Sequence, residues 1–177
     1  KCWPEESSYV DFFNPVARKY YADQYLLDNF TLNSVETGVW NDMNEPVIFD
    51  APEKTFARDA VHFDGVNNWE HRYLHNMYAL MQTMGTFDGM TRRGESKYRP
   101  FILTRAFFAG TQKYSAVWTG DNTADWGYLL ASIQVCLAIS VSGKFFSIFL
   151  RFTSSGCYLL AMSHSNDILK SQLIDAQ

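Results

Sequence analysis

Apolar residues recur at helical spacing in three stretches of the chain, and each stretch follows a residue suited to begin a helix. Asn14 followed by Pro15 is a typical start, with the Asn side chain as N-cap and Pro at the first helical position. Asn68 stands in the same way before a second pattern, in which Leu74, Met77, Tyr78 and Met81 share one face. We predict helices at 15–27, at 69–83 or beyond and at 124–140, the second weakened at its end by Gly85 and Gly89 and the third capped by Thr123 or a neighbour.

Three short apolar runs between these helices have the composition of buried strands. They span residues 35–40, 101–104 and 115–118. Alternating helices and strands are typical of parallel strands covered by helices, so the fold class is α/β. A (β/α)8 barrel carries its chemistry at the carboxyl ends of the strands. Asp42 and Asp121 each follow a predicted strand and are therefore candidate catalytic residues. Three to four strands cannot close a barrel, which needs about 250 residues.

Two further stretches need a separate interpretation, one as a loop and one as a possible membrane segment. Residues 46–67 are rich in Pro, Asp and Asn and predict a long loop. Residues 128–150 are strongly apolar, but Lys144 interrupts them, and a membrane helix needs about 20 mostly apolar residues. We therefore expect no membrane span, and predict a buried helix followed by an apolar strand.

Composition and charge indicate a globular domain. The chain of 177 residues is 47% apolar and 19% charged, and its formal net charge is −4. It has no basic stripe, so we expect no nucleic-acid partner.

The three cysteines, Cys2, Cys136 and Cys157, form no CxxC pair, so their number does not fix the redox compartment. Asn29 heads the triplet Asn-Phe-Thr and is a candidate N-glycosylation site. Neither end carries a signal peptide or a retention signal, which suggests an internal piece of a longer protein.

Asp42 and Asp121 also suit one kind of chemistry. Glycoside hydrolysis uses two carboxyl groups, one acting at the anomeric carbon and the other protonating the leaving oxygen. Asp is equally common in turns and as an N-cap, so from these positions alone both could be ordinary turn residues.

The sequence around the two aspartates resembles glycoside hydrolase family 31, the retaining α-glucosidases and their relatives. Three blocks carry the resemblance, in the family's order and separation: VWNDMNEP at 39–46, RPFILTRAFFAGTQKY at 99–114 and AVWTGDNTADW at 116–126. Between them, NWEHRYLHNMY at 68–78 is most similar to the neutral α-glucosidases. That subgroup includes the catalytic α-subunit of endoplasmic-reticulum glucosidase II. The resemblance covers residues 1–143 and implies strands like the fourth to sixth of a TIM barrel, with their helices.

The resemblance also implies roles for single residues. Asp42 matches the catalytic nucleophile and Asp121 the general acid/base. Four positions match residues that bind the substrate: Trp40, Met43, Arg105 and Trp118. Glu45 could orient the loop near Asp42, and we expect it to serve as a structural hydrogen-bonding residue. Asn44 and Pro46 are expected to shape the same loop.

The family further implies a carbohydrate substrate and no cofactor. The parent protein would hydrolyse terminal α-linked glucose with retention and trim N-glycans in the endoplasmic-reticulum lumen, with a regulatory β-subunit as candidate partner. A cytosolic neutral α-glucosidase acting on glycogen-type oligosaccharides is the alternative. A catalytically inert truncated product is a third reading.

Other features depart from the family or from known sites. Residues 144–177 show no family match and form a divergent tail, whose segment 144–150 could stand where a seventh strand would lie. His71 and His75 are four residues apart on one predicted helix, but no third metal ligand stands out, so we expect helix packing and no metal. The run from Asp121 to Asp125 begins like a calcium loop but has Trp126 where Gly is needed.

Overall fold

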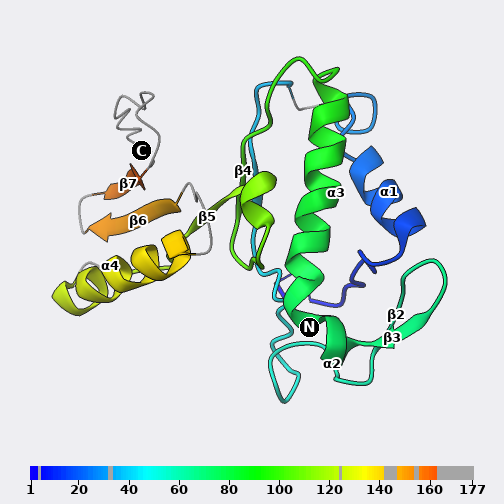
Figure 1. Cartoon of the computed structure of the whole chain (residues 1–177), viewed down its shortest axis with the longest axis horizontal. Coiled ribbons are helices and arrows are strands. Elements are labelled where there is room, and N and C mark those ends of the chain that lie inside the picture. Colours follow the sequence, from blue (N-terminus) through cyan, green and yellow to red (C-terminus); the bar gives the residue numbers. More distant parts are fainter. Residues whose placement is uncertain (4, 32–33, 124, 142–146, 154–155, 163–177) are drawn as a thin grey trace.

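A computed structural model describes residues 1–141 except 4, 32–33 and 124, together with the backbone of 147–153 and 156–162. Figure 1 shows two parts joined by strand β5 (Ala116–Trp118): a larger one built on helices α1 and α3, and a smaller one containing helix α4. Two short 3₁₀ turns, His75–Met77 between α2 and α3 and Thr111–Lys113 between β4 and β5, complete the described helices.

The central sheet is parallel where the sequence predicts it to be. Strand β1 (Val39–Asn41) pairs with β4 (Ile102–Thr104), and β4 pairs with β5. The predicted strands at 101–104 and 115–118 are confirmed, whereas the one expected at 35–40 is confined to its end. These three parallel strands do not close on themselves within the described chain, so the α/β partial TIM barrel is confirmed. The strand expected after helix α4 is also present: β6 (Ser147–Thr153) pairs in parallel with β5, and β7 (Gly156–Met162) returns antiparallel to β6.

Helix α1 (Pro15–Asp23) begins as predicted. The side chain of Asn14 accepts hydrogen bonds from Val16 N at 2.9 Å and Ala17 N at 3.4 Å. The helix ends at Asp23 and not at residue 27, because the side chain of Asn29 donates to the carbonyl of Asp23 at 2.8 Å and closes the chain into turns.

The second predicted helix differs most from expectation. Residues Asn68–Glu70 form strand β3, so Asn68 is not a helix cap. The helical segment starts as α2 (His71–Leu74) and continues through the 3₁₀ turn into α3 (Tyr78–Arg93), in keeping with a helix expected to reach residue 83 or beyond. Gly85 and Gly89 do not weaken it. A Cβ at Gly89 would lie 2.2 Å from the carbonyl oxygen of Ala22, so this glycine lets α1 and α3 pack with their backbones in contact.

The expected loop at 46–67 contains a strand. Strand β2 (Val61–Phe63) pairs antiparallel with β3, and the resulting hairpin lies below α1 and beside α2 in Figure 1. The prediction missed β2 because three residues are too few to show an alternating pattern. A core of aromatic rings joins the hairpin to the helices, with Phe12, Phe13 and Tyr78 buried at its centre.

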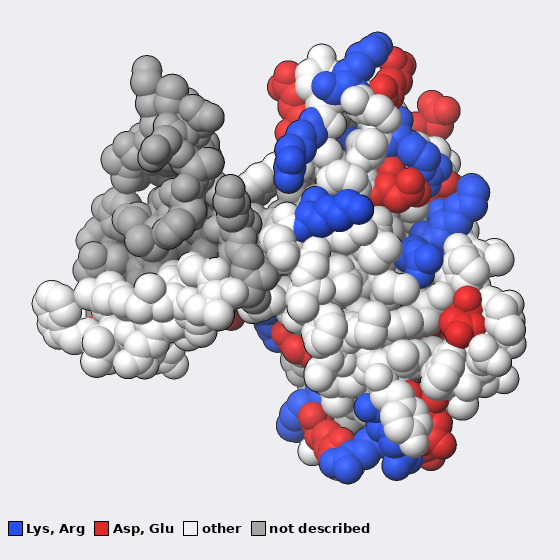
Figure 2. Space-filling view, in the orientation of Figure 1, with Lys and Arg blue, Asp and Glu red and all other residues white. Residues whose placement is uncertain are grey.

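Helix α4 (Trp126–Val141) is close to the predicted 124–140. The side chain of Asp125 caps it, accepting from Tyr128 N at 2.8 Å. It is not the buried helix that the sequence predicts, because Ser132 and Ile139 alone are buried among its residues. Figure 2 shows its surface as almost free of charged residues, whereas on the larger part Lys, Arg, Asp and Glu gather toward the upper and lower ends. In the described chain, no helix is long and apolar enough to cross a membrane.

Candidate active site

The two predicted site segments 41–46 and 104–106 meet because β1 and β4 run side by side. Asn41 pairs with Thr104 in the sheet register, and Arg105 N donates to Asn41 O at 2.9 Å. The next residue of each strand, Asp42 and Arg105, is therefore brought to the same carboxyl end. This edge is where a parallel sheet of this kind carries its chemistry.

Two hydrogen bonds orient the Asp42 side chain, and the same carboxylate oxygen accepts both. Its Oδ1 accepts from Arg105 Nη1 at 3.0 Å and from Met43 N at 2.9 Å. Met43 adopts a left-handed φ of 58°, which turns the chain sharply after Asp42. The described hydrogen bonds leave Oδ2 of Asp42 without a donor, and the side chain is 21% exposed. One carboxylate oxygen is thus fixed while the other can meet a ligand.

Glu45 binds the same arginine through both of its oxygens. Arg105 Nε lies 2.7 Å from Glu45 Oε1, and Arg105 Nη2 lies 3.0 Å from Glu45 Oε2. Arg105 Nη1 also lies 3.1 Å from Met43 Sδ. The hydrogen bonds to Glu45, with further charge from Asp42 and Asp121, raise the pKa of the Arg105 guanidinium above its usual value despite partial burial. The guanidinium is thus a permanent positive charge placed between Asp42 and Glu45.

Hydrogen bonds between buried polar side chains fix the loop that follows β1. Asn44 donates to Thr104 Oγ1 at 2.9 Å and accepts from Ala106 N at 2.9 Å, tying the loop after β1 to the loop after β4. Asn41 donates to Thr86 Oγ1 of helix α3 at 3.2 Å. The sequence analysis expected Asn44 to shape the loop but did not single out Thr86 or Thr104, because a threonine in a helix or strand carries no local signal of such a contact.

The two tryptophans lie against each other with different exposure. Their rings are 5.6 Å apart at an interplanar angle of 69°, an edge-to-face contact. Trp40 is 59% exposed, whereas Trp118 is 3% exposed. The Nε1 of Trp118 is buried without a hydrogen-bond partner in the described chain. Trp40 therefore presents a ring to solvent, and Trp118 supports it from β5.

Asp121 lies in the turn after β5. The turn begins at Gly120, whose φ of 99° requires glycine, and is closed by Asn122, which donates to Thr119 Oγ1 at 2.7 Å. Asp121 is exposed. Asp42 contacts Arg105, whereas no described hydrogen bond or ion pair joins Asp121 to this arginine.

A cavity of about 210 Å³ opens beside Asp42. Asp42 and Met43 form one wall, and segment 7–10 of the N-terminal chain forms another. Tyr78 and Gln82 of α3 also line it. A search of the described residues finds no group of His, Cys, Asp or Glu that could hold a metal ion. The described lining of this cavity is more apolar than polar, with Asp42 as its one carboxylate. Of the candidate site residues, Asp42 and Met43 line it, whereas Trp40, Arg105, Trp118 and Asp121 do not.

Comparisons with known proteins agree with this arrangement. The family profile described as "Glycosyl hydrolases family 31 TIM-barrel domain" matches residues 1–148. A "Probable glucan 1,3-alpha-glucosidase" of Oryza sativa subsp. japonica is 50% identical over 146 residues, 82% of this chain and 16% of the relative. "Neutral alpha-glucosidase AB" of Homo sapiens is 48% identical over 145 residues, 82% of this chain and 15% of the relative.

Solved structures show the same likeness in three dimensions. An ER glucosidase II heterodimeric complex, of the catalytic subunit and the binding domain of the regulatory subunit, superposes with a TM-score of 0.77 at 44% identity. The glucosidase II alpha subunit in its alpha3-Glc2-bound form gives 0.77 at 43% identity. Each match covers 84% of this chain and 16% of the other chain. The chain thus spans about one sixth of the length of the relatives that it matches.

Proposed function

Because the chain belongs to glycosyl hydrolase family 31, we propose that it forms part of the catalytic barrel of a retaining α-glucosidase. The observation that carries this proposal is the anchored carboxylate of Asp42. It lies at the edge of a cavity, one oxygen is held by Arg105 and Met43 N, and the other has no donor among the described contacts. An attacking carboxylate needs such a fixed orientation.

In this mechanism Asp42 is the nucleophile. Its Oδ2 attacks the anomeric carbon as the glycosidic bond breaks, and a covalent glycosyl-enzyme forms. Arg105 keeps the carboxylate oriented through Oδ1, and Glu45 fixes the guanidinium through a bidentate contact. Trp40 offers an exposed ring to the C–H face of a sugar. Together with Met43, it is the proposed wall of the glucose subsite, and Trp118, which the sequence resemblance also places there, is buried behind Trp40 and supports its ring.

Asp121 is the proposed general acid/base. Its proton goes to the leaving oxygen in the first step, and the resulting carboxylate removes a proton from water in the second. The position of Asp121 supports this role, because it follows β5, the strand that neighbours β4 in the same sheet. No metal or cofactor enters either step.

For the substrate, we propose α-linked terminal glucose on glucosylated N-glycans, trimmed in the endoplasmic-reticulum lumen. The similarity to glucosidase II catalytic subunits supports this, and so does the alpha3-Glc2-bound form of one of them. A regulatory β-subunit is the proposed partner, since a relative forms a heterodimer with one. The likeness to neutral α-glucosidases leaves a cytosolic enzyme acting on glycogen-type oligosaccharides as the second candidate.

One assay separates the two candidates. The full-length protein that contains this sequence is incubated with glucosylated high-mannose glycan and, in parallel, with maltose. We expect faster release of glucose from the glycan. Faster release from maltose would favour the second candidate, and activity on neither would contradict both.

We further propose that residues 1–143 are the barrel piece, that 144–177 form a separate tail, and that the 177-residue chain alone is catalytically inert. The family match ends at residue 148, close to the proposed boundary. The open sheet and the exposed face of α4 support the loss of activity, because substrate orientation in a barrel needs residues from several strands. Hydrolysis of p-nitrophenyl α-glucoside by the purified chain, with loss on Asp42→Ala, would contradict this.

A further inference from the structure

Four titratable side chains away from Asp42 form an unbroken row of hydrogen bonds. Asp11 Oδ1 lies 2.8 Å from His62 Nδ1, and His62 Nε2 lies 2.8 Å from His71 Nδ1. His71 Nε2 in turn lies 2.7 Å from His75 Nδ1. Each of the two inner rings uses both of its nitrogens within the row, so the four groups are linked as a single network.

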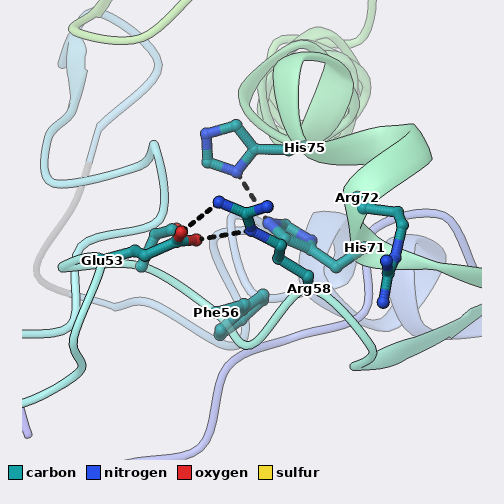
Figure 3. A pocket seen from close by; sticks show the side chains of 7 residues that line it. Glu53, Phe56, Arg58, His71, Arg72 and His75 are labelled. Carbon is teal, nitrogen blue, oxygen red and sulfur yellow. Dashed lines mark hydrogen bonds and ion pairs between the residues drawn. The ribbon is translucent and has the colours of Figure 1, made fainter.

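The two inner rings of the row are shielded, whereas both of its ends are open: His75 lies at a cavity, and the side chain of Asp11 is 28% exposed. His62 is 4% and His71 is 2% exposed, and the rings of Phe13, Phe56 and Tyr78 pack around them. His75 lines a second cavity of about 270 Å³, separate from the cavity beside Asp42. Figure 3 shows His75 at this cavity, linked to His71 behind Arg58. His71 lines the same cavity, but both of its ring nitrogens are hydrogen-bonded within the row, so Nε2 of His75 is the ring nitrogen of the row that is open to a proton there.

The other end of the row reaches the wall of the candidate active site. Asp11 is fixed by two backbone donors, Phe63 N at 2.9 Å and Phe13 N at 3.2 Å. It belongs to the N-terminal segment whose residues 7–10 and Phe12 line the cavity beside Asp42. The row thus runs from one cavity to Asp11, which lies between Val10 and Phe12 of the other cavity's lining but does not line that cavity itself.

Hydrogen-bond chemistry fixes every tautomer in this row. An ionised Asp11 can only accept, so His62 must donate from Nδ1 and accept at Nε2. His71 must then donate from Nδ1 and accept at Nε2, and His75 must donate from Nδ1. With all three rings neutral, each hydrogen bond of the row is donated in the direction of Asp11. Nε2 of His75 is then the one ring nitrogen of the row that is left to accept a proton.

We propose that Asp11, His62, His71 and His75 form a proton wire that binds one proton and carries it between the second cavity and the wall of the active-site cavity. A proton added to Nε2 of His75 leaves all three bonds intact. If each Nδ1–H proton then moves to its acceptor, His62 passes one to Asp11, and the rings end with protons on Nε2. Each hydrogen bond of the row then runs in the opposite direction. The row has gained one proton, and no other reactant is needed.

The same geometry limits the wire to one proton. A second proton would place two N–H donors against each other at one of the inner contacts and break it. Burial lowers the pKa of His71 to about 4, with the neighbouring His75 and His62 adding to the effect, so an inner ring does not hold a charge by itself. The charged or titratable groups around the row are Glu53 and Arg58, which pair with each other, Arg72, which pairs with Glu70, and Tyr9 and Tyr78.

Nitrogen NMR of histidine-labelled chain tests the wire, because ring nitrogens report tautomer and charge. The sequence has four histidines, and His164→Gln identifies the fourth and serves as the control that leaves the others unchanged. Near pH 8 we expect His62, His71 and His75 all as Nδ1–H tautomers. On lowering the pH, all three should shift together, with one shared midpoint and the uptake of one proton. Three separate midpoints, or an Nε2–H tautomer near pH 8, would overturn the proposal.

Two variants separate the wire from a merely structural row. His75→Gln can still donate to His71 but cannot be protonated, so the shifts of His62 and His71 above about pH 5 should disappear. Asp11→Asn can still accept from His62 but cannot take a proton, so His62 should keep its Nδ1 proton throughout the titration. Near-ultraviolet circular dichroism confirms that each variant is folded. Unchanged titration of His62 and His71 in folded His75→Gln would overturn the proposal.

Discussion

Helices α3 and α4 have the same length, 16 residues each, but differ in how their sequence matches their surroundings. Helix α3 carries Asp88, Arg92 and Arg93, yet it buries nine of its residues against α1 and the sheet. Helix α4 has no acidic, basic or histidine side chain and buries only two. Trp126 is 85% and Val141 is 89% exposed. The more apolar helix is the one with fewer neighbours.

This difference indicates which half of the site the described chain holds by itself. The half that contains Asp42 rests on β1, β4 and α3, where Asn41, Asn44 and the threonines are buried and paired. The half that contains Asp121 rests on the turn between β5 and α4. Large exposed apolar surfaces mark places where further protein packs, so we expect the Asp121 half to depend on chain beyond the described residues.

The largest expected effect concerns the two aspartates in the full-length protein. Asp42→Asn should lower kcat/KM by about 10⁴-fold or more, because an amide cannot act as the nucleophile. Asp121→Asn should cost about 10² to 10⁴-fold. An activated glucosyl fluoride, which needs no acid to leave, should restore the first step for Asp121→Asn alone. The opposite pattern of rescue would mean that the two roles are exchanged.

Two glycines give a matched test of packing in the two helices. Gly89→Ala in α3 should destabilise the fold by about 3 kcal/mol or more, because the new Cβ would meet the carbonyl of Ala22 at 2.2 Å. Gly127→Ala in α4 meets only Asp125 Oδ1, at 3.2 Å, and should change stability by less than about 1 kcal/mol. Urea denaturation of both variants provides the measurement. Equal costs would show that α4 is packed as tightly as α3.

Acid should destabilise the part around α2 and α3 but not helix α4. His71 takes up a proton near pH 6.5 when unfolded but near 4 when folded, so the unfolded state binds more protons between these values. Stability is therefore complete above about pH 6.5 and falls as the pH drops toward about 4, by about 3 kcal/mol. Denaturation followed at several pH values, with His71→Phe as comparison, measures this. A pH-independent midpoint in the unsubstituted chain would contradict it.

Glu45→Gln should give the smallest change. The amide oxygen can still accept from Arg105 Nε, but the second charged contact, now 3.0 Å from Arg105 Nη2, is lost. A charge-assisted hydrogen bond contributes about 1.5 kcal/mol, so kcat/KM of the full-length protein should fall about tenfold. Steady-state kinetics with an α-glucoside decide this, and Glu36→Gln, at an exposed site, is the control. A loss as large as that of Asp42→Asn would give Glu45 a direct part in the chemistry.

Much of the fold follows from local sequence signals. Asn14 and Pro15 begin α1 as predicted, and the apolar runs before Arg105 and before Thr119 form β4 and β5. The errors lie where tertiary contacts override local preference. Gly89 reads as a helix breaker, but it is the point where α1 approaches α3. Asn68 reads as a cap, but its backbone pairs with Phe63 in a hairpin.

In the candidate site, too, some residues could be predicted from the sequence and others could not. The family resemblance assigns Asp42 and Arg105 to the site from two separate sequence blocks, and the structure has these two side chains in contact. The row from Asp11 to His75 could not be predicted, because His62 lies on a strand that the sequence does not reveal. His71 and His75 were expected to pack within the helix, and the structure shows them hydrogen-bonded to each other without a metal group in the described residues.

The most direct test of the central claim is to trap the covalent intermediate in the full-length protein. A fluorinated glucosyl fluoride that forms the glycosyl-enzyme quickly but hydrolyses it slowly is added, and the modified peptide is identified by mass spectrometry. We predict one sugar attached to Asp42 and no adduct in Asp42→Asn. A sugar attached to Glu45, Asp121 or any other residue would contradict the assignment of Asp42 as the nucleophile.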